Sequence, residues 1–163
     1  DVVTFKALQV VVSNGWELQS NEWDGSYVHT ARVAAQRAYA EAGITKPREQ
    51  VSMTEVHDCF SITELVTMED LGLSDVGGAV KDVLDGVFDA EGKIPCQIDG
   101  GLKCFGHPIG ASGIRMHYEM YLQLQGRAGA RQLRNPSVGL THNLGGQPSQ
   151  NVCSVSIVGL EGA

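Results

Sequence analysis

A glycine-rich segment at residues 100–113 surrounds a single histidine, His107. Five of its fourteen residues are glycine, which is used where the backbone needs a positive φ or a close approach to another group. Pro108 stiffens the backbone directly after the histidine, and residues 114–124 continue as an amphipathic helix. We therefore expect His107 on a rigid turn beside the unpaired N–H groups of a helix start, which suit an anion or a developing oxyanion.

A second group of reactive side chains, His57, Asp58 and Cys59, lies where a predicted strand meets a predicted helix. Alternate residues of an extended chain point the same way, so His57 and Cys59 would face one side and form an acid/base pair. The alternative is that Asp58 caps the following helix while Cys59 belongs to the core. The glycine-rich segment at 100–113 and a third polar segment at 142–146 favour the catalytic interpretation.

The third segment, residues 142–146, reads His-Asn-Leu-Gly-Gly. Gly145 and Gly146 either form a hairpin turn or offer backbone N–H groups to an oxyanion, whereas we expect His142 to be structural. All three segments follow predicted strands, and sites in α/β sheets collect at the carboxyl ends of the strands. We therefore expect the three to meet, with His107 as a general base for a thiol.

The elements that must position these residues alternate as β-α-β-α-β-α-β-β. This order predicts an α/β fold, with a five-stranded mixed sheet that is mostly parallel, helices on both faces, and the last two strands antiparallel. We find no internal repeat or linker, and expect one domain over residues 1–163. The predicted strands are 4–13, 51–56, 94–98, 137–142 and 151–158; the predicted helices are 28–42, 61–71, a weak one within 74–92, and 111–126; residues 16–25 are predicted to be a loop.

Composition excludes several classes of protein. The net charge of −7 argues against a nucleic-acid-binding protein, and no apolar run is long enough to span a membrane. The four cysteines lack the C-x-x-C spacing of a zinc site, and they suggest reduced thiols in a cytoplasmic protein rather than a disulfide framework. The acidic residues between 75 and 91 lack the ligand spacing of a calcium loop, so no metal is expected.

Two of these motifs carry a resemblance to a known family. Gly-Gly-Leu-x-x-x-Gly-His-Pro-x-Gly-Ala-x-Gly at 100–113 resembles the signature loop of the thiolase superfamily. His-Asp-Cys-Phe at 57–60 is similar to the variant motif of the sterol-carrier-protein-2 type thiolases, a branch often named lipid-transfer proteins or acetyl-CoA acetyltransferases. The resemblance extends over essentially the whole chain but corresponds only to the C-terminal half of a thiolase, in which two such halves pack as a five-layer structure that is usually dimeric.

The resemblance implies a role for each site residue. His107 would activate a nucleophilic cysteine, His57 would bind the thioester oxygen in an oxyanion hole, and Cys59 would be the proton-shuttling thiol. Gly145 would lend its N–H group to a second oxyanion hole, with Gly146 and Asn143 beside it in substrate binding. Asn143-Leu-Gly145 stands where many thiolases have Cys-x-Gly, and Cys59 would take over from that cysteine.

The resemblance also implies what the chain lacks and what it binds. None of its four cysteines lies in the motif of the nucleophilic cysteine, which belongs to the N-terminal half, and the chain begins abruptly without a methionine. We therefore expect a fragment, a processed subunit or an excised domain that is inactive alone. Its substrate would be a coenzyme A thioester, with no bound cofactor, and its partners the N-terminal half and a second copy in a homodimer. Without its partner half, the chain should self-associate through helix 111–126 or the first strand.

Two alternatives to a thiolase remain. A thiolase-like aldolase of the steroid side-chain type would split a 3-hydroxyacyl-CoA by retro-aldol chemistry without the nucleophilic cysteine, together with a DUF35 partner. A non-catalytic acyl-CoA binding or lipid-transfer subunit is the other alternative. Retention of His57, Cys59 and His107 together argues against this second alternative, because binding alone needs no acid/base pair.

Overall fold

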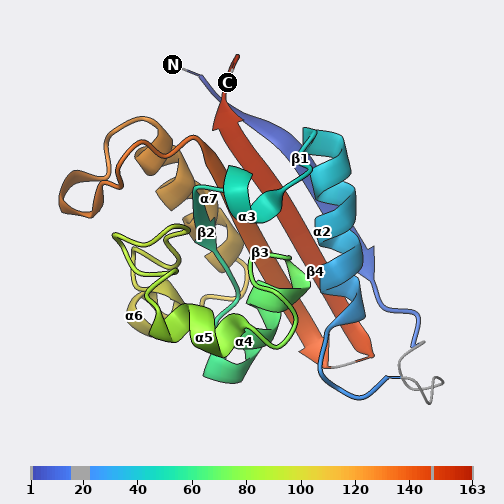
Figure 1. Ribbon diagram of the computed structural model, residues 1–163. Helices are drawn as coiled ribbons and strands as arrows, with labels where there is room; N and C mark the ends of the chain where they lie inside the picture. The colour runs from blue at the N-terminus through green and yellow to red at the C-terminus, as the bar shows by residue number, and fades with distance from the viewer. Residues whose placement is uncertain (1, 16–22, 148, 163) are drawn as a thin grey trace.

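The core of the computed structural model is one four-stranded sheet in the order β1–β4–β3–β2, with the two long strands β3 and β4 at its centre (Figure 1). The structure describes residues 2–15, 23–147 and 149–162, so residues 16–22 of the predicted loop at 16–25 lie outside it. The strands are β1 (Val3–Val12), β2 (Met53–Glu55), β3 (Val138–Gln147) and β4 (Gln150–Leu160).

The sheet is mixed, as predicted, but it is not mostly parallel and its fifth strand is missing. β4 pairs antiparallel with both β1 and β3, and only β2 and β3 are parallel. Residues 94–98 contribute a single parallel bridge from Cys96 to Thr54 instead of a strand. Pro95 has no N–H group to donate to a ladder, and Gln97, with a φ of 55°, leaves the extended conformation directly after the bridge.

Helix α2 (His29–Ala42) covers one face of the sheet and confirms the helix predicted at 28–42. Its buried face is built from small side chains, which let the helix approach β1 and β4 closely. Gly43, with a φ of 70°, ends the helix in the left-handed conformation. Four alanines form the core of this contact: Ala31, Ala34, Ala35 and Ala38.

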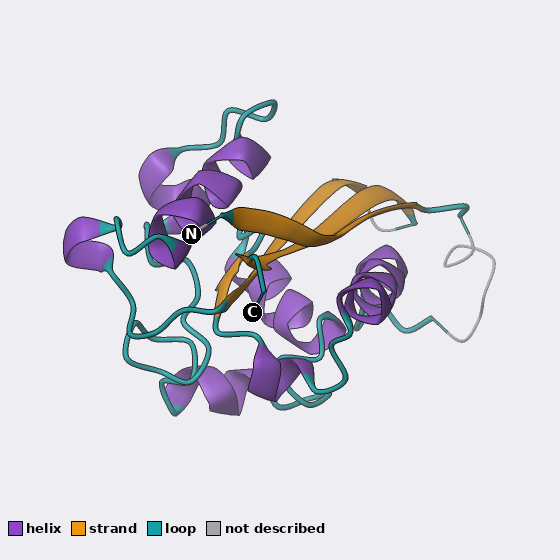
Figure 2. Ribbon diagram, turned by 90° about the horizontal axis from the view of Figure 1, so that it is seen from above, coloured by secondary structure: helices purple, strands orange, loops and turns teal. Residues whose placement is uncertain are grey.

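Helix α7 (Ser112–Leu124) covers the opposite face, so that helices lie on both sides of the sheet (Figure 2). Met120 and Leu124 pack with Met53 and Val158 in a second hydrophobic cluster. Gly139 of β3 permits this contact, because a Cβ atom there would lie 2.5 Å from the Met120 sulfur. The helix predicted at 111–126 is thereby confirmed, and it begins five residues after His107.

Shorter helices and one 3-10 turn connect the remaining elements. The helix predicted at 61–71 is confirmed, and the weak helix within 74–92 is reduced to two turns. A helix at Gly101–Phe105 was not predicted, because the glycines around it indicated a loop. No helix of the described residues is both long and apolar enough to cross a membrane. These elements are α3 (Pro47–Gln50), α4 (Ser61–Asp70), α5 (Ala79–Leu84), α6 (Gly101–Phe105) and a 3-10 turn, η1 (Gly129–Arg131).

An ion pair fastens α5 to α3 and gives the fold a predictable acid response. The Arg48 guanidinium binds both carboxylate oxygens of Asp82 at 2.6 and 2.7 Å, and Ser74 donates to the same carboxylate at 2.7 Å. The hydrogen bond from Arg48 lowers the pKa of Asp82 to about 2. Since an unfolded Asp titrates near 4, this stabilisation is complete above about pH 4 and is lost as the pH falls through about 2.

We expect Asp82→Asn to lower the free energy of unfolding at pH 7 by about 1–3 kcal/mol, because it removes a charge-assisted pair. The difference from the wild type should shrink between pH 4 and pH 2, where the wild type also loses the charge. Urea titrations at several pH values measure both effects. Asp85→Asn, which removes an exposed carboxylate paired with Lys81, is the matched control and should change stability little. A constant difference from pH 7 to pH 2 would contradict this account.

Candidate functional site

The three reactive segments of the sequence meet at one edge of the sheet. β2 and β3 run parallel, so residues after β2 and residues late in β3 lie at the same end. The parallel bridge at Cys96 brings the glycine-rich segment to that end as well. One cavity of about 790 Å³ is lined by all six predicted site residues: His57, Cys59, His107, Asn143, Gly145 and Gly146.

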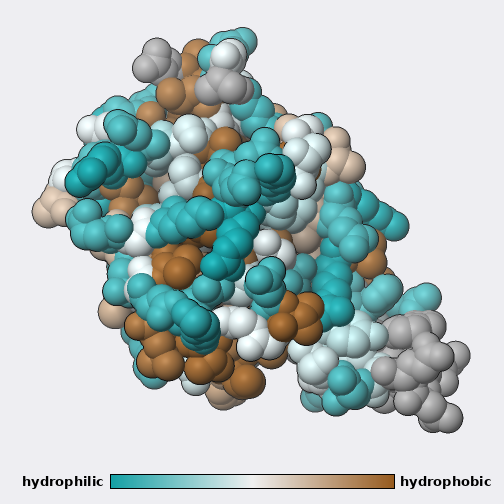
Figure 3. Space-filling model, viewed as in Figure 1, coloured by the Kyte–Doolittle hydropathy of each residue, from teal (hydrophilic) through white to brown (hydrophobic). Residues whose placement is uncertain are grey.

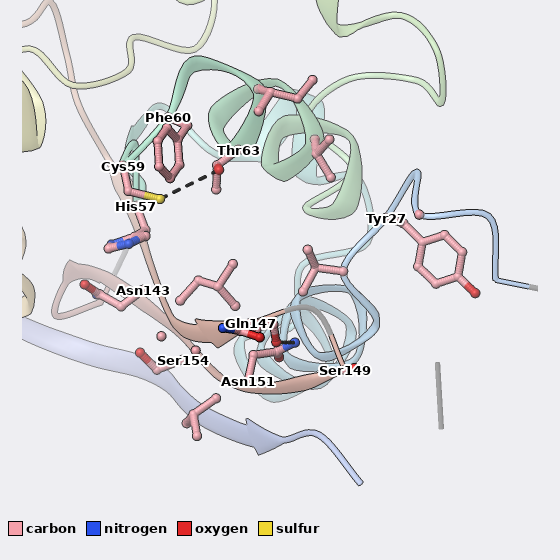
Figure 4. A pocket seen from close by; sticks show the side chains of 18 of the residues that line it. Tyr27, His57, Cys59, Phe60, Thr63, Asn143, Gln147, Ser149, Asn151 and Ser154 are labelled. Carbon is pink, nitrogen blue, oxygen red and sulfur yellow. Dashed lines mark hydrogen bonds between the residues drawn. The ribbon is translucent and has the colours of Figure 1, made fainter. Parts of the chain in front are cut away.

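The cavity lies between α4 and the ends of β3 and β4 (Figure 4). His57 and Cys59 lie at one end of it, above Asn143, whereas Tyr27 lies at the other end. Apolar side chains form much of the remaining wall, so the cavity joins a polar end that can perform chemistry to a wall that suits a hydrocarbon. These apolar residues are Val28, Phe60, Ile62, Val66, Ile109, Leu144 and Val152.

The two predicted catalytic imidazoles contact each other. The ring centroids of His57 and His107 are 5.0 Å apart and the rings meet edge to face. Burial and the neighbouring His107 lower the pKa of His57 below its ordinary 6.5, so that His57 is neutral at pH 7. A neutral imidazole still carries one N–H donor. His57 can therefore donate a hydrogen bond to a substrate oxygen without bringing a positive charge next to His107.

His107 is oriented by the first residue of α7. Its Nδ1 atom lies 2.8 Å from the Ser112 hydroxyl, which donates its own hydrogen to the Pro108 carbonyl at 3.3 Å. We assign the ring hydrogen to Nδ1, because the Ser112 hydroxyl has one hydrogen and Pro108 accepts it, so that the Ser112 oxygen accepts from Nδ1–H. The lone pair of the imidazole then remains on Nε2, which is the state that a general base needs.

Cys59 is exposed in the cavity, which contradicts the alternative that it belongs to the core. It lies on the same side as His57, as the alternation of an extended segment predicts. Its thiol is 3.7 Å from the Thr63 hydroxyl, one turn into α4. The thiol is therefore available to a ligand in the cavity. The second part of that alternative, that Asp58 caps α4, is also wrong, because the N-cap position belongs to Phe60 and has no side-chain hydrogen bond.

Gly145 and Gly146 play different parts. Gly146 has a φ of 102°, and a Cβ atom there would lie 2.3 Å from the Gln150 carbonyl, so this glycine serves the β3–β4 hairpin. A Cβ atom on Gly145 would point into open space within the cavity. A ligand can therefore approach the backbone at Gly145, as an oxyanion hole requires. Asn143, two residues earlier on β3, lines the cavity and lies against Gly113.

His142 is structural, as predicted. It is fully buried, and its Nδ1 atom accepts a hydrogen bond of 3.5 Å from the backbone N–H group of His57. Burial, with a smaller effect of the neighbouring His57, lowers the pKa of His142 to about 3. It therefore stays neutral and holds the backbone N–H group of His57. Ser112 was missed from the sequence, although its position at the start of the helix after His107 was a usable signal.

Comparison with known proteins shows which family the chain is similar to. A family model described as thiolase C-terminal domain-like matches residues 14–157. The chain is 42% identical over 113 residues to an acetyl-CoA acetyltransferase of Methanothermobacter thermautotrophicus, an alignment that covers 69% of this chain and 29% of the relative. It is also 42% identical over 117 residues to sterol carrier protein 2 of Oryctolagus cuniculus, covering 71% and 21%. The matches span less than a third of each relative.

Solved structures share the fold at low sequence identity. The Ltp2-ChsH2(DUF35) aldolase superposes with a TM-score of 0.79 at 19% identity, covering 99% of this chain and 40% of that chain. A peroxisomal 3-ketoacyl-CoA thiolase of Saccharomyces cerevisiae, described as five-layered and built from two core domains of identical topology, superposes with a TM-score of 0.55 at 16% identity, covering 98% and 35%. The architecture is thus that of a thiolase-like half.

Proposed function

The chain belongs to the thiolase C-terminal domain-like family, and from this membership we propose that it is the C-terminal half of a thiolase-type acyltransferase. The reaction is the thiolysis of a 3-oxoacyl-CoA, or the Claisen condensation in reverse. The observation that carries the proposal is that His57, Cys59 and His107 line one cavity, with the two imidazoles in contact. The matched segment covers less than a third of the two relatives described above, so the activity is that of a longer protein that supplies the nucleophilic cysteine.

In this proposal each side chain moves or holds a proton at a stated place. Nε2 of His107 takes the proton of the nucleophilic cysteine, whose thiolate attacks the 3-oxo carbon of the substrate. The bond between C2 and C3 breaks, and its electron pair passes to the enolate of the thioester. His57 donates a hydrogen bond to the enolate oxygen, and the Cys59 thiol protonates C2, which releases acetyl-CoA and leaves the shortened acyl group on the nucleophilic cysteine.

The second half of the cycle returns every group to its starting state. The Cys59 thiolate takes the proton of an incoming coenzyme A thiol, whose sulfur attacks the acyl-cysteine. The tetrahedral oxyanion accepts a hydrogen bond from the backbone N–H group of Gly145, beside Gly146 and Asn143. When the acyl group leaves as acyl-CoA, the nucleophilic cysteine recovers its proton from His107. The cycle needs no bound cofactor beyond the coenzyme A of the substrates.

Thiolysis of acetoacetyl-CoA by the full-length protein tests the proposal. Turnover together with an acyl-cysteine detected by mass spectrometry in the other half supports it. Turnover should disappear when the nucleophilic cysteine is replaced. A full-length protein that has no cysteine at that position, or that does not cleave the substrate, contradicts the thiolase proposal.

The second candidate is a retro-aldolase that acts on a 3-hydroxyacyl-CoA with a DUF35 subunit. The fold supports it, because the TM-score is higher with the Ltp2-ChsH2(DUF35) aldolase than with the yeast thiolase. Retro-aldol cleavage needs a base for the 3-hydroxyl group and a donor for the enolate oxygen, which His107 and His57 would supply. Cleavage of a 3-hydroxyacyl-CoA without a covalent intermediate distinguishes it from the thiolase. Binding of acyl-CoA with neither reaction would instead favour a lipid-transfer subunit.

Exposed apolar side chains indicate where the rest of the protein or a second copy packs. Phe5, Leu8, Val10 and Val12 of β1 are each more than half exposed. A separate apolar surface lies along the lower edge of Figure 3, where α4 and α5 lie in Figure 1. Leu84, the last residue of α5, is exposed. Such surfaces are usually covered by a partner. We propose that the N-terminal half and the homodimer partner cover them.

The isolated chain should therefore self-associate through β1. Light scattering should give a mass above the 17.4 kDa of one chain. Leu8→Lys with Val10→Lys places charges on the exposed apolar face of β1, so it should restore the monomer mass. Gln9→Lys, on the same strand, is the control and should leave the mass of the associated form unchanged. A monodisperse monomer of the unaltered chain would contradict the prediction.

A further inference from the structure

One side-chain amide holds the residue that precedes His57. The Nε2 atom of Gln97 donates to the Val56 carbonyl at 2.6 Å, and its Oε1 atom accepts from the Val56 N–H group at 3.3 Å. Val56 is fully buried and lies just beyond β2. The amide thus satisfies both backbone groups of Val56 in place of a neighbouring strand. The direction in which the chain enters His57 is fixed by this contact.

Gln97 also starts the turn that leads to His107. Its backbone N–H group donates to Thr54 at 3.1 Å, and its carbonyl accepts from Gly100 at 2.8 Å. Its φ of 55° is in the left-handed region, which a side chain as large as glutamine rarely adopts. A strained backbone persists only where its surroundings over-determine it, and such residues cluster at functional sites. Here the strain lets one residue serve both segments.

Asp58 makes the second link between the same two segments. Its Oδ1 atom accepts a hydrogen bond of 3.0 Å from the Leu102 N–H group, in the first turn of α6. Gly101, with a φ of 62°, lies against both links: a Cβ atom there would be 2.3 Å from Asp58 Oδ2 and 3.0 Å from Gln97 Nε2. The carboxylate and the amide therefore both lie on the side of Gly101 where a side chain would project, and only glycine fits.

From these contacts we propose that Gln97 and Asp58 are positioning residues, a brace that fixes the His57–Cys59 segment relative to the segment that carries His107. Neither residue lines the cavity, so both act through the residues that do. The brace holds the chain on each side of His57, at Val56 and at Asp58, while His142 holds the N–H group of His57 itself. The proposal rests on the proposed function only in expecting this spacing to matter for turnover.

Kinetics of the full-length protein test the brace with variants of matched size. Gln97→Glu keeps the acceptor but places an oxygen against the Val56 carbonyl, and Asp58→Ala removes the acceptor for Leu102. Both should lower kcat about 10- to 100-fold with KM changed less than about threefold, because the reacting groups are misplaced while the substrate walls are intact. Asp58→Asn keeps the acceptor oxygen and should retain kcat within about threefold.

A second readout does not depend on turnover. NMR titration of the two imidazoles, assigned with His57→Gln and His107→Gln, measures the pKa of His57, which depends on how close His107 lies. His57 faces His107, His142 and Asp58, and its pKa is lowered by burial and then by His107. When Gln97→Gly breaks the brace, the pKa of His57 should rise toward its ordinary value. Asp58→Ala is compared with Asp58→Asn instead of the wild type, because both remove the carboxylate charge that raises this pKa. If the wild type cleaves neither acyl-CoA, the proposed function fails while this titration still tests the brace.

Backbone strain is separated from hydrogen bonding by a pair of glycine variants. Gln97→Gly relieves the left-handed φ but deletes the amide, so it should match Gln97→Glu in kcat. In the titration the shift in Gln97→Gly reports the brace, because the added carboxylate of Gln97→Glu itself raises the pKa of His57. Asn135→Gly relieves a comparable φ of 51° at an exposed residue away from the cavity and should leave both unchanged. Wild-type kcat in both Gln97 variants and unshifted imidazoles in Gln97→Gly would overturn the proposal. If the Gln97 variants do not fold, the Asp58→Ala and Asp58→Asn pair decides by the same criteria.

Discussion

Replacing His107 with alanine in the full-length protein should lower kcat for thiolysis about 10²- to 10⁴-fold, the range of a positioned general base. Ser112 accepts from Nδ1 of this imidazole and leaves the Nε2 lone pair free, so the side chain is prepared to take a proton. His107 lines the cavity on its glycine-rich turn, so removing the ring removes the proposed base. Steady-state kinetics and detection of the acyl-cysteine measure the loss.

The acylation step identifies the cause of that loss. If His107 activates the nucleophile, the burst of acyl-cysteine should slow together with kcat. His29→Ala, on α2 outside the cavity lining, is the matched control and should retain wild-type kinetics. A wild-type burst in His107→Ala would assign the ring to a later step and contradict its role as the base for the cysteine.

Replacing Cys59 with alanine should also lower kcat for thiolysis about 10²- to 10⁴-fold, but for a different reason. The thiol lies in the cavity beside His57, where it can protonate the α-carbon and later take the proton of coenzyme A. Acylation of the nucleophilic cysteine requires cleavage of the bond between C2 and C3, but it does not require Cys59 to take the proton of coenzyme A. Rapid-quench kinetics should therefore show acyl-cysteine accumulating in Cys59→Ala.

Cys104 supplies the control for this experiment, because it is exposed but does not line the cavity. Cys104→Ala should keep wild-type turnover. The pair also separates the two candidate reactions. A retro-aldolase would need no thiol to carry the proton of coenzyme A, so retained cleavage of a 3-hydroxyacyl-CoA by Cys59→Ala would favour the aldolase. Undiminished thiolysis by Cys59→Ala would remove the proposed proton shuttle.

The meeting of the site residues could be predicted because each motif has its own local signal. Glycine and proline around His107 mark a turn, and the alternation of His57 and Cys59 places both on one side. The rule that sites collect at strand ends then brings the segments together. The same reasoning could not show that Asp58 reaches Leu102 rather than α4, since the choice depends on where α6 begins.

The sequence predicts the α/β class of the fold, but it does not predict which strands pair with each other. The alanine face of α2 and Gly43 determine a helix from local spacing alone, and the structure confirms it. Residues 94–98 have the composition of a strand, but Pro95 and the left-handed Gln97 limit them to one bridge. Gln97 has no motif around it, and its role depends on Val56, far away in sequence. Pairing and bracing of this kind depend on tertiary geometry, which a single sequence does not reveal.

The pairing of β1 with β4 has a consequence for how the protein is made. Val3 pairs with Leu160, so among the described residues the first strand pairs only with a strand near the opposite end of the 163-residue chain. At roughly 5–20 residues per second, the ribosome takes on the order of ten seconds between the two. During that interval the apolar side chains of β1 have no ladder to join. The β3–β4 hairpin can form from local contacts, whereas we expect β1 to pair later, in a slow non-local step. Until then the apolar side chains of β1 remain exposed and prone to aggregation.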